Sequence, residues 1–355
     1  MEELEFILNN LEQLEKGSLC IAIIPMRCAL YDSGEGVELK EKLLNNHTLE
    51  AVLSMPDELF YNSNVGTNTC IMVTKAKEKH PKNYKTYFGY WKDDGFYKKR
   101  TSGRADYDHT WNQIKNYWLE NYRNRDEVVE HSVKKSIKPT DEWCVEQYMT
   151  TDYKELNEEL MRTLVLNYLS FCVSRGKFIA IKDFINENKK LKLDTETWKD
   201  FEVGKLFDVT LGKAIHKNTI KDFSKTNKKE FIPYVTRTTK NNGVELYVHN
   251  SKIDTDKYMK GNAITIGAEG FKAFYQEETF ITGNKVNILR NDKLNLKIAL
   301  FLNSVLNLEI EKKFGYGRGL VQKRIEKLSI KLPVDSDGKP DWKFMEDFIL
   351  SLDYE

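Results

Sequence analysis

Three short apolar runs near the start of the chain restrict most strongly the folds open to this sequence. They cover residues 19–24, 49–53 and 68–74, and stretches with helical periodicity separate them. The first run, LCIAII, is closed by Pro25, a profile typical of a strand buried on both faces. Alternation of helix and buried strand predicts an α/β layered sheet. Because only three strands are expected in about 75 residues, the segment predicts the last part of such a domain.

Further elements follow from periodicity. Apolar residues at three- and four-residue spacings predict helices over 2–16 and 37–45, and a loop over 56–66. Residues 78–140 are polar and irregular apart from a helix over 111–120, and 152–191 is mostly helical, with a Lys-rich end that predicts a domain boundary. After residue 198 the pattern changes to short β-rich runs. They cover 201–210, 231–236, 245–248, 263–266, 271–275 and 285–289 and precede helices over 294–314 and 342–352.

Charge divides the chain in the same way. Residues 198–332 hold 25 Lys and Arg against 15 Asp and Glu, and the rest of the chain holds 30 against 39. A basic segment in a chain of net charge +1 favours a polyanionic partner, although a solvated basic face without a partner is the alternative.

Several functional classes lack support in the sequence. The five cysteines are scattered and form no CxxC pair, which predicts reduced thiols and no metal site. The sequence contains no phosphate-binding GxxxxGK[ST], HExxH, GxSxG or GxGxxG motif, so no catalytic residue is assigned. It also lacks an apolar run long enough for a membrane span, and we expect a cytoplasmic protein.

A glycine-rich cluster, GYGRG at 315–319, carries cations on both sides. Arg318, Lys323 and Arg324 next to flexible glycines are suited to DNA phosphates. The alternative is a helix that ends at glycine, with the cations stabilising its C-terminus.

A second cluster, YVTRTTKNNG at 234–243, has the residue types that read bases. Arg237 can contact guanine, Asn241 and Asn242 can contact adenine, and Thr239 can contact a base edge or a phosphate. The same residue types are common in ordinary hairpin turns, and Asn242–Gly243 is a strong turn signal. Two weaker basic clusters supply further phosphate candidates. They are 212–217, with the candidates Lys213 and Lys217, and 267–272, with the candidate Lys272. The second of them is grouped with Asn284 and Lys285, and the alternative for both is lysines that are simply solvated in turns.

Ordered motifs carry a resemblance to a known family. The stretches SLCIAIIPMR at 18–27, LKEKLLNNHTLEAVLSMPDELFY at 39–61 and GTNTCIMVTKAK at 66–77 resemble the final third of an N6-adenine DNA methyltransferase domain. Such domains occur in modification subunits of type I restriction-modification systems and in fused type IIG and IIB enzymes. Residues 87–122 are similar to the segment that follows the methylase core. From residue 197 the chain resembles a type I target-recognition domain, on the motifs WKDFEVGKLFDVTLGKA, IPYVTRTTKNNGVE, GNAITIGAEGF and KFGYGRGL.

The resemblance implies a partial Rossmann-like α/β methyltransferase segment (1–125), a helical spacer (126–196) and an α+β target-recognition domain with a C-terminal helix (197–355). In this family an early glycine-containing motif binds S-adenosylmethionine, and an Asn/Asp-Pro-Pro-Tyr/Phe tetrapeptide holds the flipped adenine. This sequence contains neither, and it has no Pro-Pro pair. We therefore expect no cofactor binding and no methylation by this chain alone.

The leading hypothesis is sequence-specific recognition of double-stranded DNA within a restriction-modification system. Methylase or restriction subunits are the expected protein partners. The alternative is an interaction subunit that complements a separate upstream methylase fragment, because a truncated sheet would expose surface that its missing strands normally cover. A nuclease acting alone has no motif behind it.

Overall fold

The structure, a computed structural model, describes residues 2–177 and 191–354, which form two units. Unit 1 consists of Met1–Asp152 together with Lys312–Arg318, and unit 2 consists of Tyr153–Glu311 and Gly319–Glu355. The chain therefore passes between the units three times. The segment expected to be a helical spacer contributes to both units, and its residues 178–190 lie outside the described part of the chain.

Unit 1 is built on a mixed five-stranded sheet with the order β1-β3-β2-β4-β7. Its strands are β1 (Leu19–Pro25), β2 (Thr48–Ser54), β3 (Thr69–Lys75), β4 (Thr86–Tyr90) and β7 (Ser132–Lys135). The three strands expected from apolar runs are confirmed. The pair β2–β4 is parallel, and the other neighbouring pairs are antiparallel. The first half of the chain is thus an α/β unit in which antiparallel pairing predominates.

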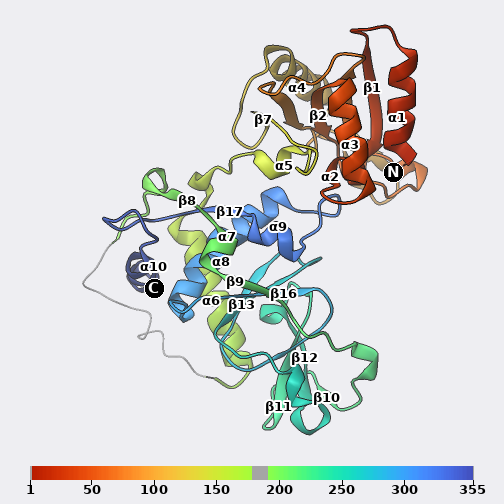
Figure 1. The fold of residues 1–355 in the computed structure, drawn as a ribbon. Helices are drawn as coiled ribbons and strands as arrows, with labels where there is room; N and C mark the ends of the chain where they lie inside the picture. Colours follow the sequence, from red (N-terminus) through yellow and green to blue (C-terminus); the bar gives the residue numbers. More distant parts are fainter. Residues whose placement is uncertain (1, 178–190, 355) are drawn as a thin grey trace. The chain divides into compact units, whose positions relative to one another are not determined.

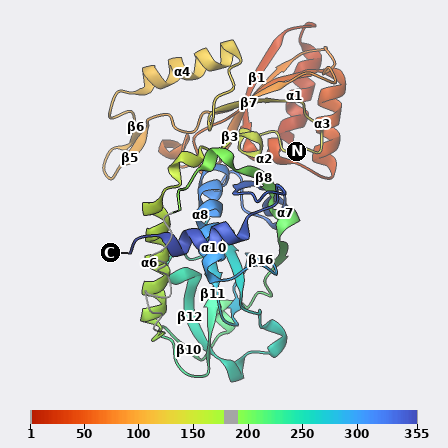
Figure 2. The ribbon, with the colours of Figure 1, turned by 90° about the vertical axis from the view of Figure 1, so that its left-hand side faces the viewer.

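Helices cover both faces of the sheet centre (Figures 1 and 2). One face packs against α1 (Glu2–Gln13), α2 (Met26–Leu30) and α3 (Glu35–Asn46) in a core that includes Leu11 and Met72. The opposite face packs against α4 (Trp111–Asn124), where Trp118 stacks on Trp91 with the ring centroids 5.3 Å apart. Two smaller elements complete the unit. They are α5 (Val145–Tyr148) and the hairpin of β5 (Tyr97–Lys99) and β6 (Gly103–Ala105).

The expectation that residues 19–24 are buried on both faces is wrong. β1 is an edge strand, and on one face Leu19, Ile21 and Ile23 are 59%, 67% and 58% exposed. The other face packs partly into the α1 and α3 core through Cys20 and Ala22. The second core cluster, which contains α4, includes no residue of β1, so this apolar strand keeps one open face.

The sequence analysis missed β4 because residues 78–140 appear polar and irregular as a whole. Its residues Thr86, Tyr87 and Phe88 are completely buried. A run of five residues between lysines is too short to give a clear period, and pairing with β2 and β7 fixes it as a strand.

Unit 2 is an α+β arrangement with three small sheets. Their orders are β10-β12-β11-β15, β14-β13-β16-β9 and β17-β8. The strands are β8 (Lys199–Glu202), β9 (Asp208–Leu211), β10 (Phe223–Ser224), β11 (Phe231–Val235), β12 (Val244–His249), β13 (Ala263–Gly267), β14 (Ala273–Gln276), β15 (Ile281–Thr282), β16 (Val286–Arg290) and β17 (Ser329–Leu332). The run expected over 201–210 is divided by one helical turn, α7 (Val203–Leu206), into two strands that belong to different sheets.

The helices of unit 2 supply much of its core. Besides α7, the α-helices in the described part of unit 2 are α6 (Glu158–Ser174), α8 (Leu296–Lys313), α9 (Gln322–Glu326) and α10 (Trp342–Ser351). The helices expected over 294–314 and 342–352 are confirmed. Figure 2 shows α10 crossing α8, where the rings of Phe301 and Phe348 meet edge to face at 6.0 Å. Among the described helices, none is both long and apolar enough to cross a membrane.

Candidate nucleic-acid interface

Four loops of unit 2 that are separated in sequence lie together, and we call them the recognition loops. They cover residues 212–217, 236–243, 267–272 and 282–285. Backbone hydrogen bonds join them in pairs or to the strands that carry them: Ile215 N donates to Thr282 O (2.8 Å), Gly283 N to Val235 O (2.8 Å) and Ala268 N to Lys285 O (3.0 Å). Three of the four basic clusters in the sequence thus form one surface. The fourth cluster, at 315–324, is not part of it.

A buried tyrosine fastens the first loop to the sheet. Tyr234 on β11 is 3% exposed, and its hydroxyl donates a 2.7 Å hydrogen bond to Ile215 O. Burial raises the pKa of Tyr234, so the phenol remains a donor throughout the physiological range.

Glycines allow the loops to approach closely. A Cβ atom on Gly270 would lie 2.4 Å from the carbonyl oxygen of Arg237, and one on Gly267 would lie 2.7 Å from the Arg237 Cα. A Cβ on Gly212 would meet the Thr282 hydroxyl at 2.4 Å. Each distance is shorter than any van der Waals contact, so glycine permits the backbones at Gly267 and Gly270 to touch that of Arg237, and the backbone at Gly212 to touch the Thr282 side chain.

The recognition loops are strongly basic. They contain six Lys and Arg residues and a single acid, Glu269. The lysines Lys213, Lys217, Lys240, Lys272 and Lys285 are all exposed. Within the described part of the chain, Lys240, Lys272 and Lys285 form no ion pair, so their ammonium groups face solvent without a compensating acid. A concentrated positive surface of this kind attracts phosphate.

The expected base-contact residues occupy different environments. Thr239 and Asn241 are exposed on the second loop. Arg237 is partly exposed and forms an ion pair with Glu269 of the third loop. Asn242 instead shapes the turn, because it has a left-handed φ of 54° and its amide donates to Tyr275 O at 2.7 Å. Three of the four therefore present free or exchangeable groups.

The residues expected to contact phosphates also fall into two groups, on and off the recognition loops. Lys213 donates to Asp256 O (2.7 Å), Lys217 pairs with Glu245, and Lys272 stands free on the third loop. These three lie on the recognition loops, as expected for one surface.

The remaining phosphate candidates lie elsewhere in the fold. Exposed Lys323 and half-buried Arg324 belong to the short helix α9, which packs against β9. Arg318 belongs to unit 1, is 3% exposed and pairs with buried Glu142. Its guanidinium is enclosed by protein, so we remove Arg318 from the candidate phosphate contacts.

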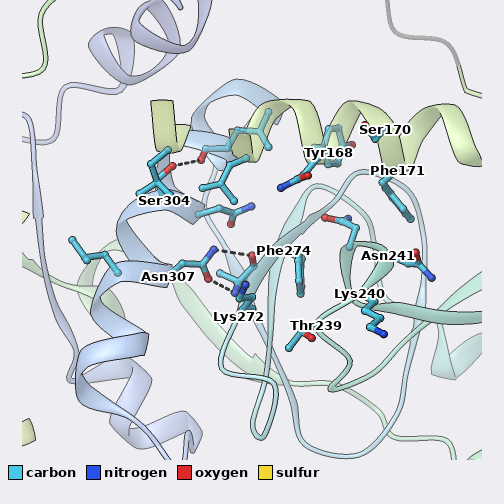
Figure 3. A pocket seen from close by; sticks show the side chains of 18 of the residues that line it. Tyr168, Ser170, Phe171, Thr239, Lys240, Asn241, Lys272, Phe274, Ser304 and Asn307 are labelled. Atoms are coloured by element: carbon cyan, nitrogen blue, oxygen red, sulfur yellow. Dashed lines mark hydrogen bonds between the residues drawn. The ribbon is translucent and has the colours of Figure 1, made fainter. Parts of the chain in front are cut away.

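A cavity of about 850 Å³ opens beside the second and third loops (Figure 3). It is lined by α6, α8, residues 239–242 and the start of β14. Asn307 on α8 holds that start in place, since its side chain accepts from Ala273 N at 2.7 Å. Asn303 is 5% exposed, and its Oδ1 atom finds no hydrogen-bond partner among the described residues.

Sequence reasoning missed Lys240 as a candidate contact and gave Lys285 no role, although both lie in clusters that it singled out. The charge of the clusters was a sufficient signal for these two lysines. No local signal pointed to Asn303, Asn307 or the α6 side of the cavity, because helix periodicity alone does not show which loops pack against a helix.

Family models of known proteins match the chain in two segments, and the first segment ends close to Asp152, where the main part of unit 1 ends. Residues 1–155 match the model of the N-6 DNA methylase family, and residues 195–355 match the model of the type I restriction modification DNA specificity domain. The chain thus carries a methyltransferase region followed by a specificity domain.

Two curated relatives come from Heyndrickxia coagulans. The type II restriction enzyme and methyltransferase RM.BcgI is 32% identical over 48% of this chain and 26% of its own length. The specificity subunit S.BcgI is 34% identical over 44% of this chain and 43% of its own length. The chain thus spans less than half the length of either relative. Among solved structures, the HsdS subunit of Thermoanaerobacter tengcongensis is 13% identical over 56% of this chain and 45% of that chain, with a TM-score of 0.31.

Proposed function

From a chain that joins a methylase region to a DNA specificity domain, we propose that unit 2 reads the sequence of double-stranded DNA for a restriction-modification system that methylates adenine at N6. The observation that carries this proposal is the meeting of four recognition loops with six cations and one acid, inside the region matched by the specificity-domain model. Phosphate contacts fix the register of a protein on DNA, and side chains at base edges supply specificity.

We assign base contacts to Arg237, Thr239 and Asn241 on the second loop. Asn242 contributes by holding the turn that presents Asn241, since its own amide is used by Tyr275 O. Arg237 has to leave Glu269 to reach a guanine, so the acid acts as a competitor that a correct base must displace.

Phosphate contacts fall to lysines around these groups. Lys213, Lys217 and Lys272 are joined by Lys240 and Lys285, which are exposed and without an acidic partner among the described residues. We propose a duplex because the loops offer Arg, Asn and Thr for groove edges. Their only Phe, Tyr or Trp is Phe271, which is half-buried and offers little surface for stacking unpaired bases.

The experiment is selection from a randomised duplex library, followed by affinity measurement against salt. We expect one sequence to be enriched and its affinity to fall steeply as salt rises. Retention of every duplex to the same extent would contradict sequence recognition, and failure to retain any duplex would contradict DNA binding itself.

A second function, assembly with a preceding methylase segment, is favoured by the open face of β1. Among the described strands, β1 has a neighbour on one side only, and its exposed apolar face lies beside Phe6 of α1, which is 69% exposed. A strand supplied by such a segment would extend the sheet at this edge, and the rest of the segment would cover Ile21 and Ile23 on the open face. Unit 1 would then be the terminal part of a Rossmann-like methyltransferase sheet.

S-adenosylmethionine is the methyl donor that the methylase family implies, and the residues of unit 1 do not fit it. In the described part of unit 1, the loops that follow β2 and β4 hold a glycine at Gly66 and Gly95, and neither glycine lies directly after its strand, where it would cradle the donor. The carboxyl ends of the parallel pair β2 and β4 are instead closed by an ion pair of Lys92 with Asp57 (3.0 Å). The donor site would therefore lie on the preceding segment.

The assembly is tested by mixing the chain with a methylase fragment that contains the Pro-Pro motif, a DNA duplex and labelled methyl donor. We expect no incorporation by the chain alone and incorporation by the mixture. The variant Ile21→Lys should abolish the rescue while the free chain stays folded, because Ile21 is 67% exposed. Incorporation by the chain alone, or rescue by the variant equal to that by the parent, would rule out this reading.

A further inference from the structure

The segment Lys312–Arg318, which we call the strap, belongs to unit 1, although the residues on both sides of it belong to unit 2. It is continuous with α8, whose earlier part lies in unit 2. The strap closes on itself through two backbone hydrogen bonds between Gly315 and Arg318, of 3.2 and 3.1 Å. It is therefore a formed turn with a defined shape.

Arg318 anchors the strap by a buried guanidinium with three partners. Its Nε donates to Glu142 Oε2 (2.8 Å), its Nη2 to Gln147 Oε1 (2.6 Å) and its Nη1 to Lys313 O (3.1 Å). The group also lies over the ring of Phe314, 4.6 Å from its centroid. Only arginine offers several fixed donors in one plane, so neither lysine nor an apolar residue can satisfy all three acceptors.

The strap contacts the loop that joins β2 to β3, residues 55–68. With its amide oriented to satisfy both partners, Asn68 accepts a hydrogen bond from Gly317 N and donates one of 3.1 Å to Asp57 O. A Cβ on Gly317 would lie 2.8 Å from the Asn68 amide, so the glycine permits the approach. The backbone of the strap thus packs against the Asn68 side chain of the loop.

This loop begins at the carboxyl ends of the parallel strands β2 and β4. Lys92, just after β4, pairs with Asp57 (3.0 Å) and with buried Glu146 (3.2 Å). Ser54, at the end of β2, donates to Glu146 at 2.8 Å. In open α/β sheets, ligands bind outside the carboxyl ends of parallel strands, so loop 55–68 lies at the end of the sheet where this rule places a ligand.

We propose that Arg318 is a positioning residue: it holds the strap in unit 1 so that Gly317 packs on loop 55–68, and binding of DNA by unit 2 thereby changes the dynamics of this loop at the carboxyl ends of β2 and β4. The physical route is covalent, because α8 leads directly from the specificity region into the strap. This inference rests on the proposed DNA-reading function of unit 2.

The test is hydrogen–deuterium exchange of peptides from loop 55–68 in the full chain, with and without the duplex selected above. In the parent we expect saturating DNA to slow exchange in this loop at least about threefold. In Arg318→Met the loop should exchange about tenfold faster without DNA and should no longer respond to DNA, while the Kd for the duplex stays within about twofold. Arg318→Lys should show an intermediate response.

Two further variants separate positioning from simple stability. In Arg318→Met/Glu142→Met the buried carboxylate beside position 318 is removed together with the guanidinium, so the melting temperature should recover while the response to DNA stays lost. Arg125→Met is the matched control, since Arg125 also pairs with an acid in unit 1, Glu50 on β2, but forms no hydrogen bond or ion pair with the strap among the described residues. It should lower stability and keep the response.

The outcomes are distinguishable. Unchanged exchange in loop 55–68 of the parent, with DNA bound, overturns this inference and leaves the DNA-reading function intact. A normal response in Arg318→Met also overturns it. A chain that binds no duplex overturns the proposed function and this inference together.

Discussion

Arg237 and Glu269 form an ion pair that joins the second and third recognition loops, with side chains 38% and 49% exposed. Both charges remain accessible to solvent, so the pair adds little to the stability of the fold, of the order of 0–1 kcal/mol. The pair lies beside the close contacts of Gly267 and Gly270 with the Arg237 backbone. This position suits an Arg237 side chain that exchanges Glu269 for another partner.

The first prediction concerns this pair. Arg237→Ala should cost about 1–3 kcal/mol of DNA binding free energy and relax the preference at one base pair, because a bidentate contact to guanine is lost. Glu269→Gln should tighten binding, since the competing carboxylate is gone. Affinity and base preference are read by competition with duplexes changed at single positions. An Arg237→Ala chain with parental affinity and preference would show that Arg237 does not read a base.

The second prediction concerns the close approach of the loops. Gly270→Ala places a methyl group against the Arg237 carbonyl, at 2.4 Å, and should cost about 1–3 kcal/mol of unfolding free energy in unit 2 and weaken DNA binding. Gly319→Ala is the matched control, because a Cβ there meets nothing within 4 Å. Denaturant unfolding and duplex affinity measure both effects. Equal results for the two variants would mean that the loops are not held together as described.

The third prediction separates phosphate contacts from other surface lysines. Each of Lys240→Gln and Lys272→Gln should weaken binding to all duplexes alike and reduce the slope of log affinity against log salt by roughly 0.9. Lys327→Gln removes an exposed lysine outside the recognition loops and should leave the slope unchanged. A slope that fell equally in all three variants would indicate only a general effect of net charge.

The fourth prediction concerns acid stability. In unit 1, burial lowers the pKa values of His47, His80 and His131. As pH falls below about 6.5, the unfolded chain takes up protons before the folded chain does, so stability is present above that value and is lost on acidification. We expect slower exchange of β2 amides at pH 7.5 than at pH 5.5, after correction for intrinsic rates.

The control for the acid prediction is His80→Gln. His80 Nδ1 accepts a hydrogen bond from Leu49 N at 3.3 Å, which a Gln oxygen can replace without titrating. This variant should show a weaker dependence on pH than the parent. The same dependence in both chains would assign the effect to other groups.

Local pattern predicted much of the fold. The apolar runs that became β1, β2 and β3 and the stripe of α8 were recognisable because burial repeats at the period of the element itself. The pattern could not place β4, whose five residues are fixed as a strand by pairing with β2 and β7. It also gave β1 two buried faces, whereas the described residues cover only one.

By itself, the sequence determined the change from an α/β pattern to short β-rich runs, the basic character of the second half of the chain and the residue types that suit a polyanion, because these depend on composition and short-range order. Only the tertiary structure decided which cations are available. Lys272 lies free on a loop, whereas Arg318 is enclosed against Glu142, although both stand beside glycine-rich stretches in the sequence. The difference arises from residues more than a hundred positions away, and the desolvation that it imposes on a side chain leaves no mark in the local sequence.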